Sequence, residues 1–185
     1  MARWGSGAAG PQARFFRQFS HHLIGFATWL PPLIWFNTFV AEATFIHGPS
    51  MYPFLNPHYN ESLRQDLCLV YKLYAHENLQ RGMVVTFRSP EDPNQITVKR
   101  VVGLEGDTVR TRAPYPFEYV HVPSGHVWVE GDGDKTKDSN TYGPISARLI
   151  TGRITHILSP WNRAGRVKWW EHRERDGVRR EAESL

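Results

Sequence analysis

The hydrophobic and polar positions of this chain follow two patterns. The residues from Leu23 to Ala41 are uncharged and mostly apolar, and these 19 residues would extend about 28 Å as an α-helix. That length is close to the hydrocarbon core of a bilayer, about 30 Å, which predicts a membrane-spanning helix. Beyond residue 42, short runs rich in β-branched and aromatic residues alternate with Gly, Pro, Asn and Asp, as is typical of β-strands joined by turns. The expected strands are 67–73, 83–87, 96–102, 108–112, 119–122, 127–130 and 149–158.

A basic N-terminal segment, residues 1–22, precedes the apolar stretch. The first 41 residues contain no Asp or Glu, and Arg3, Arg14 and Arg17 would stay on the side from which a helix inserts. An acid-free start that carries arginines also resembles a mitochondrial targeting segment. We therefore interpret residues 23–41 as a retained, single-pass transmembrane anchor in a lipid bilayer.

Two prolines complicate this interpretation. Pro31 and Pro32 lie in the middle of the apolar stretch, where they should kink or break a helix. Transmembrane helices tolerate such breaks better than soluble helices do. The alternative is two short apolar helices that lie on a surface or pack on the domain.

The rest of the 185-residue chain fits one β-rich domain, residues 42–160, and a charged tail, residues 161–185. The tail carries three tryptophans, and we expect it to be solvated or partly helical rather than an amphipathic contact helix. The single cysteine, Cys68, excludes an internal disulfide and lies in a strand-like run, so we expect a buried thiol. The net charge is +4, but the basic residues are dispersed along the chain, and no zinc-finger or RNA-binding motif indicates a nucleic-acid partner.

The segment from Gly48 to Pro53 reads Gly-Pro-Ser-Met-Tyr-Pro. Its two prolines and its glycine favour a stiff turn that holds the Ser50 hydroxyl and a neighbouring backbone N–H in fixed directions. Such an N–H can stabilise the oxyanion of an acyl-transfer reaction. An ordinary Pro/Gly turn with an exposed serine is the alternative.

A lysine within an apolar strand supplies the second candidate group. In residues 96–102, strand alternation places Lys99 and Arg100 on opposite faces, so one of the two cations should point inward. An inward lysine is rare, and burial lowers its pKa so that the neutral amine can act as a base for a serine. The alternative is an edge-strand lysine that faces water.

The third block runs from Gly131 to Pro144 and contains alternating acidic residues. It lacks the glutamate that closes a twelve-residue calcium loop, so we expect no metal site there. Together, and in this order, the three blocks resemble the type I signal peptidases of the Ser-Lys class. The resemblance covers roughly residues 23–158 and implies a mainly β, signal-peptidase-like catalytic domain with one N-terminal transmembrane helix.

The family resemblance also implies roles for individual residues. Ser50 would be the nucleophile and Lys99 the general base, and Thr136 takes the place of a family serine near the lysine amine. We further expect Ile46, Val98 and Met51 to line a substrate pocket that accepts only a small residue before the scissile bond.

This sequence departs from the bacterial members at two points. Gly48 replaces a serine whose hydroxyl helps to bind the oxyanion, so the oxyanion hole would rest mainly on the Ser50 N–H or on another donor. Asp138-Ser139-Asn140 replaces Asp-Ser-Arg, so the bacterial Asp–Arg ion pair cannot form as such. One subgroup of the mitochondrial members of the family resembles the chain at both points.

The resemblance therefore implies a membrane-anchored serine endopeptidase of the mitochondrial inner membrane, with its catalytic domain in the intermembrane space. It would remove sorting peptides from precursor proteins, with no metal or organic cofactor and with a related second peptidase subunit as its heterodimer partner. The alternatives are a bacterial or endomembrane signal peptidase, and an anchored β-domain that binds peptides with an inert dyad.

Overall fold

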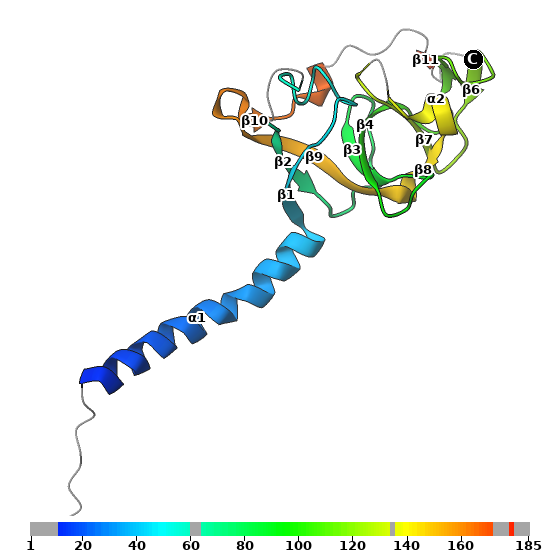
Figure 1. The fold of residues 1–185 in the computed structure, drawn as a ribbon. Helices are drawn as coiled ribbons and strands as arrows, with labels where there is room; N and C mark the ends of the chain where they lie inside the picture. The colour runs from blue at the N-terminus through cyan, green and yellow to red at the C-terminus, as the bar shows by residue number, and fades with distance from the viewer. Residues whose placement is uncertain (1–10, 60–63, 134–135, 172–177, 180–185) are drawn as a thin grey trace, which may run out of the picture. The chain divides into compact units, whose positions relative to one another are not determined.

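The computed structural model describes residues 11–59, 64–133, 136–171 and 178–179 (Figure 1). The chain divides into two units, one that ends at Phe39 and one that begins at Val40. The first unit contains helix α1, and the second contains all of the strands. The mainly β domain predicted from the sequence is confirmed.

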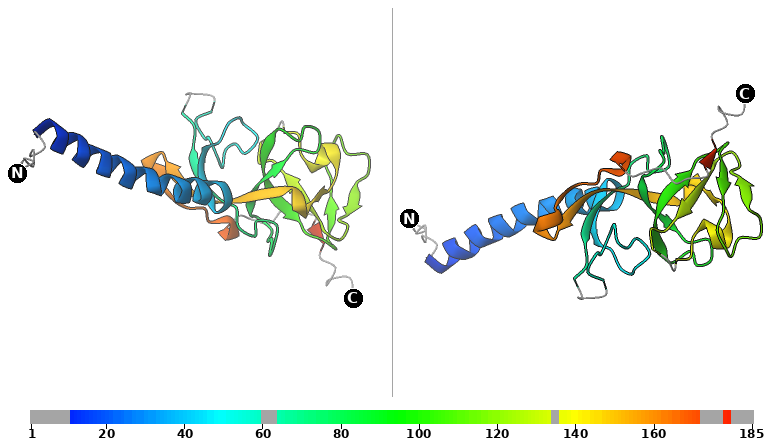
Figure 2. Two further views of the ribbon diagram at one scale, coloured as in Figure 1. Left: turned by 90° about the horizontal axis from the view of Figure 1, so that it is seen from below. Right: turned by 90° about the horizontal axis from the view of Figure 1, so that it is seen from above.

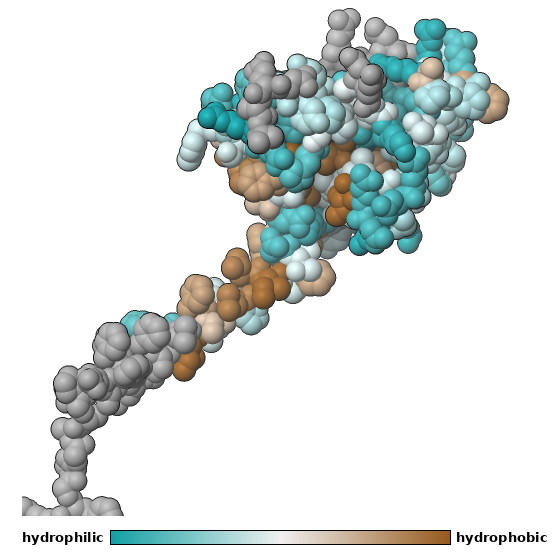
Figure 3. Space-filling view, viewed as in Figure 1, coloured by the Kyte–Doolittle hydropathy of each residue, from teal (hydrophilic) through white to brown (hydrophobic). Residues whose placement is uncertain are grey.

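Helix α1 runs without interruption from Pro11 to Phe39 and includes Pro31 and Pro32, so the expected break does not occur. Each proline removes only one backbone donor, and the remaining turns keep the segment helical. From Ile24 onward its large apolar side chains are exposed, as the brown residues in Figure 3 show. No helix in the described part of the chain combines the length and the hydropathy needed to cross a membrane.

The second unit contains two antiparallel sheets. The larger has the order β1–β2–β9–β3–β4–β7–β8, and β10 pairs with β9; the smaller has the order β11–β5–β6. The strands of the larger sheet are β1 Ala41–Phe45, β2 Leu67–Tyr71, β3 Val84–Arg88, β4 Ile96–Gly103, β7 His126–Glu130, β8 Ile145–Ser146, β9 Ile150–Ser159 and β10 Gly165–Arg166. The smaller sheet contains β5 Thr108–Arg110, β6 Tyr119–His121 and β11 Val178–Arg179, and the short helical segments are α2 Ser139–Tyr142, η1 Ala147–Leu149, η2 Trp161–Arg163 and η3 Trp169–Glu171.

The seven strands expected from the sequence are all present, with ends that differ by at most two residues. The long strand β9 links the two halves of the larger sheet (Figure 2). Its first half pairs with β3, and its second half pairs with β2 and β10. As a result β3 and β4 lie in the middle of the sheet, and β4 carries Lys99.

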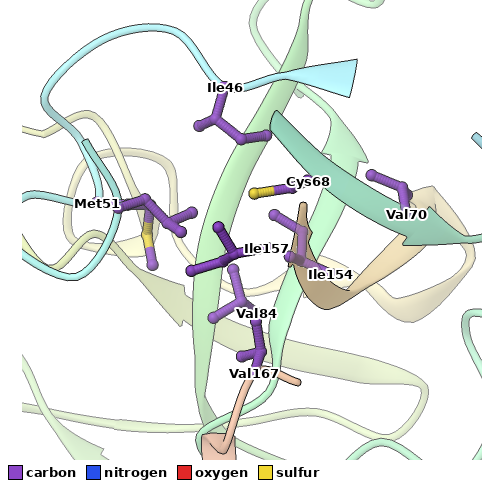
Figure 4. Packing of buried hydrophobic residues seen from close by; sticks show 9 residues of the cluster. Ile46, Met51, Cys68, Val70, Val84, Ile154, Ile157 and Val167 are labelled. Carbon is purple, nitrogen blue, oxygen red and sulfur yellow. The ribbon is translucent and has the colours of Figure 1, made fainter. Parts of the chain in front are cut away.

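Two buried clusters of apolar side chains hold the larger sheet together. One surrounds Cys68 and includes Ile46, Met51, Val84 and Ile157 (Figure 4). The second contains the inward side chains of β3, β4, β7 and β9. The Cys68 thiol is fully buried, as expected, and burial raises its pKa to about 12, so it stays protonated and unreactive at neutral pH.

The C-terminal segment packs on the domain farther than the sequence indicated. Residues 161–171 do not form a free end, because β10 pairs with β9 and Val167 is buried in the cluster around Cys68. Trp169 packs against both apolar clusters, and the Arg163 guanidinium forms an ion pair with the buried Asp66. Trp161, in contrast, is 92% exposed. The domain thus extends at least to η3.

Candidate active site

Ser50 lies in a turn that follows β1 and is fixed from both sides. Gly48 has a φ of +84°, a conformation that a residue with a side chain rarely adopts, and it redirects the chain toward Ser50. On either side of the serine, Ile46 and Met51 are buried in the cluster around Cys68. The Asn56 side-chain amide donates to the Ile46 carbonyl at 2.8 Å and to the Gly48 carbonyl at 3.3 Å. The half-buried Ser50 therefore has little freedom to move.

Lys99 and Arg100 are adjacent on β4, and each is only 2% exposed. The sequence predicted one inward cation, whereas the structure buries both because both faces of β4 are covered. Arg100 pairs with Asp132, with Nε–Oδ1 and Nη2–Oδ2 distances of 2.9 and 2.5 Å, and its guanidinium lies over the Phe54 ring. Lys99 has no ion pair among the described side chains.

The Lys99 amine meets Thr136 instead. Its Nζ donates a hydrogen bond to Thr136 Oγ1 at 2.5 Å. Burial lowers the pKa of Lys99 from 10.5 to about 8, although the negative charges of Asp138 and Asp132 act in the opposite direction. This shift raises the fraction of neutral amine at pH 7 by roughly 300-fold relative to an ordinary lysine. At pH 7 about a tenth of the Lys99 amines are therefore neutral, against fewer than about one in a thousand for an ordinary lysine.

Two glycines bring the segment that carries Thr136 against the backbone of the serine turn. The Gly133 N–H donates to the Ser50 carbonyl at 3.2 Å. A Cβ on Gly131 would lie 2.5 Å from both the Ser50 carbonyl oxygen and Thr136 Oγ1, and a Cβ on Gly133 would lie 2.5 Å from the Pro49 carbonyl oxygen. Only glycine permits such close contact without a shift of the backbone. The spacing of these two glycines in the third block therefore has a structural cause.

A cavity of about 290 Å³ joins these groups. It is lined by five of the residues expected from the sequence, namely Ser50, Lys99, Thr136, Gly48 and Val98. Ile46 and Met51 do not line it, and their side chains point into the cluster around Cys68 (Figure 4). The rim carries an ion pair between Lys137 and Glu91 at 3.0 Å. The cavity thus brings a serine and a buried lysine of lowered pKa to one surface.

Asp138 holds the third block in shape. Its carboxylate caps α2 by accepting from the Asn140 backbone N–H at 2.9 Å, and it also accepts from the Gly131 N–H at 3.0 Å. The Asn140 side-chain oxygen in turn accepts from the Arg112 backbone N–H at 2.7 Å. Asn140 thus joins the third block to the segment around Arg112 through hydrogen bonds of its side-chain amide. An arginine at this position would form an ion pair instead.

Sequence reasoning missed three functional-site features: the Arg100–Asp132 pair, the Asn56 bridge and Tyr142, whose ring lines the cavity. For the Arg100–Asp132 pair the sequence did contain a signal, namely two adjacent cations on β4 and an acidic residue directly after Gly131. No comparable signal marked Asn56. Among the described residues, no three His, Cys, Asp or Glu side chains gather closely enough to hold a metal ion.

Comparisons with known proteins agree with this geometry. The family model described as "Signal peptidase, peptidase S26" matches residues 20–115. Mitochondrial inner membrane protease subunit 2 of Schizosaccharomyces pombe is 43% identical over 150 residues, which are 80% of this chain and 82% of that protein. The Saccharomyces cerevisiae protein of the same name is 40% identical over 160 residues, 85% of this chain and 88% of that protein. Human mitochondrial inner membrane protease subunit 1 is 39% identical over 126 residues, 66% of this chain and 72% of that protein. The chain therefore belongs to the signal peptidase family, peptidase S26, and shares most of its length with relatives named as subunits of the mitochondrial inner membrane protease.

Proposed function

We propose that this chain is a serine endopeptidase of the mitochondrial inner membrane, with Ser50 as its nucleophile and Lys99 as its general base. The observation that carries the proposal is a buried lysine whose pKa is about 8 and which shares one cavity with Ser50. A serine hydroxyl becomes an effective nucleophile only when a nearby base accepts its proton. Within the described residues, no histidine lines this cavity except His47, which is exposed.

In the first half of the reaction, Ser50 Oγ attacks the scissile carbonyl carbon and the neutral Lys99 amine accepts the hydroxyl proton. The resulting ammonium group gives a proton to the leaving amine, the C–N bond breaks and an acyl-enzyme ester remains on Ser50. In the second half, Lys99 accepts a proton from a water molecule that attacks the ester. The proton then returns to Ser50 Oγ as the acid product leaves.

The backbone N–H of Ser50 is available to the oxyanion. No described residue accepts a hydrogen bond from this N–H, while the Ser50 carbonyl is held by Gly133. A preorganised donor at this position would stabilise the charge that develops in the transition state. Gly48 contributes no side-chain donor, and the space where its Cβ would lie is open.

We further propose that α1 is a single-pass anchor and that the catalytic domain faces the intermembrane space. The uncharged stretch 23–41, its exposed apolar side chains and the arginines that precede it support this topology. The substrates would be precursor proteins with cleavable sorting peptides. A related subunit 1 would be the heterodimer partner, since proteins of that name belong to the same family.

Cleavage of a candidate presequence by the full-length chain, with and without the partner subunit, tests the enzymatic proposal. Ser50→Ala and Lys99→Met should each remove nearly all cleavage, and the double variant should be little worse because the two groups act as a unit. Ser124→Ala, in an exposed loop, is the matched control. Near-normal turnover by either single variant would refute the assignment.

The topology has a separate test. Alkaline carbonate extraction should leave the chain with the membrane, and protease should reach the catalytic domain only after the outer membrane is ruptured. Release into the soluble fraction would contradict the anchor.

A further inference from the structure

One ion pair lies at the rim of the cavity that contains the candidate dyad. Lys137 Nζ is 3.0 Å from the Glu91 carboxylate, and both residues line the same cavity as Ser50 and Lys99. The lysine side chain is 77% exposed and the glutamate side chain is 44% exposed. Both charged groups are therefore accessible to a peptide that enters the cavity.

The backbone that carries each charge is tied to the site. Glu91 belongs to the loop between β3 and β4, where its N–H donates to the Ser89 hydroxyl at 3.3 Å. Lys137 directly follows Thr136, whose hydroxyl accepts a hydrogen bond from the Lys99 amine. The lysine side chain is long and exposed, so it can change partner while its backbone stays beside the base.

An ion pair between exposed side chains is held weakly. Water and salt screen both charges, and two long side chains lose freedom when they are held in one geometry. A carboxylate from a substrate can therefore take the place of Glu91 on Lys137 at little cost, because the released Glu91 carboxylate returns to water.

The charges that line the cavity favour a negative substrate group. Among the described residues that line it, the amines of Lys99 and Lys137 oppose one carboxylate, that of Glu91. At pH 7 about nine-tenths of the Lys99 amines carry a proton, and His47, which also lines the cavity, adds no negative charge. The two aspartates that act on the Lys99 pKa do not line the cavity, and both already accept hydrogen bonds. A substrate carboxylate thus meets two amines, whereas a substrate amine meets one carboxylate.

We propose that Lys137 makes this chain favour substrates with an acidic side chain close to the scissile bond, which displaces Glu91 from the lysine. This inference rests on the proposed peptidase function. Lys137 acts on the choice of substrate rather than on proton transfer, because Lys99 and Thr136 hold the base. The preference for a small residue and the preference for an acidic one come from different parts of one cavity, the apolar wall at Val98 and the charged rim.

Competition between peptides tests the inference in the full-length chain with its partner subunit. Each position around the cleavage site of a presequence peptide carries in turn Asp, its uncharged isostere Asn, or Lys. At one position or more, the wild type should cleave the Asp peptide with a kcat/KM about two- to fivefold above that of the Asn peptide, the size expected of one exposed charge pair. The preference should fall as salt is added, because salt screens exposed charges.

Variants of the ion pair should change this preference in opposite directions. Lys137→Met should abolish it, and Lys137→Glu should replace it by a preference for the Lys peptide. Glu91→Gln should strengthen it, since the lysine then has no competing carboxylate. Lys168→Met is the matched control, because Lys168 pairs with Glu171 at 3.1 Å, is 61% exposed and does not line the cavity. Ratios are compared within each variant, so a change in turnover that is common to all peptides cancels.

Three results would overturn the inference. One is equal kcat/KM for the Asp and Asn peptides at every position in the wild type. The second is a preference that persists in Lys137→Met, with or without a fall in turnover, which would leave Lys137 a structural role only. The third is an equal loss of preference in Lys168→Met, which would assign the effect to the net charge of the chain.

A binding measurement keeps this inference separate from the catalytic proposal. On Ser50→Ala, the Asp peptide should bind about two- to fivefold more tightly than the Asn peptide, and on Ser50→Ala/Lys137→Met the two should bind equally. If Ser50→Ala still cleaves, the catalytic assignment fails while the affinity ratio still tests Lys137. Equal affinities on Ser50→Ala, together with cleavage by the wild type, would reject the contact with Lys137 and leave the catalytic assignment intact.

Discussion

The Lys99 amine donates a hydrogen bond to Thr136 across 2.5 Å, and this contact joins the middle of the sheet to the loop that lies against Ser50. A neutral amine that donates one N–H to Thr136 keeps its lone pair free for a proton. The threonine thus fixes where the lone pair points, while burial of Lys99 sets how basic it is.

Thr136→Val keeps the shape of the side chain and removes the hydroxyl. We expect turnover to fall by about 10- to 100-fold, or roughly 1.4–2.7 kcal/mol of barrier, with little change in folding. The lost acceptor had stabilised the ammonium form, so the Lys99 pKa should fall below about 8 and the activity midpoint should move to lower pH. Thr136→Ser should have a mild effect. Equal pH–rate profiles for the valine and serine variants would assign Thr136 an ordinary loop role.

Lys99 should make the enzyme both active and less stable. Because its pKa in the folded chain, about 8, lies below the 10.5 of the unfolded chain, folding opposes the charged form by about 3 kcal/mol at pH 7. Between about pH 8 and 10.5 the unfolded chain holds a proton that the folded chain has released, so this cost disappears as pH rises. Activity should rise with pH through about 8 as the amine becomes neutral.

Lys99→Met tests this linkage. The variant should be inactive yet more stable than the wild type at pH 7, and its advantage should shrink by about 3 kcal/mol between pH 7 and 10.5. Denaturant titrations of the full-length chain in detergent, followed by tryptophan fluorescence, measure the difference at each pH. An advantage that is constant with pH would show that burial does not lower the Lys99 pKa.

The adjacent cations of β4 show where sequence reasoning succeeds and where it stops. Alternation assigned Lys99 and Arg100 to opposite faces, but it cannot tell that each face is covered by another part of the chain. Arg100 is buried because Asp132, 32 residues away, and Phe54 both reach it. Contacts between segments so distant in sequence leave no periodic pattern, and the packing of residues 161–171 was missed for the same reason.

Gly131→Ala tests the contact between the third block and the serine turn. A Cβ there would lie 2.5 Å from the Ser50 carbonyl oxygen and from Thr136 Oγ1, so the loop must move away from one of them. We expect more than a tenfold loss of kcat, measured on peptide cleavage, because small misplacements of catalytic groups are costly. Gly25→Ala in α1, where nothing lies within 4 Å of the added carbon, should leave activity unchanged. Equal activity of both variants would mean that the loop adapts freely.

Ile46 illustrates a different limit of the sequence. Its spacing from Ser50 and its apolar side chain predicted a pocket wall, and both Ile46 and Met51 are indeed buried. Sequence spacing does not reveal on which side of the turn an apolar residue packs. Their side chains enter the cluster around Cys68, whereas Val98 both contacts that cluster and lines the cavity.

A comparison of the variants Ile46→Ala and Val98→Ala therefore distinguishes a residue of the buried cluster from a residue that lines the cavity. Truncating Ile46 should destabilise the chain by about 2–5 kcal/mol, the usual effect of a cavity in a core, and should leave the preference for a small residue before the scissile bond unchanged. Truncating Val98 should widen the cavity and admit larger residues, with specificity loosened by about 1–3 kcal/mol per methylene rather than inverted. Thermal unfolding and cleavage of a peptide panel measure the two effects. If Ile46→Ala broadens the preference as much as Val98→Ala does, the core cluster and the substrate pocket are mechanically one unit, and the separation drawn from the structure fails.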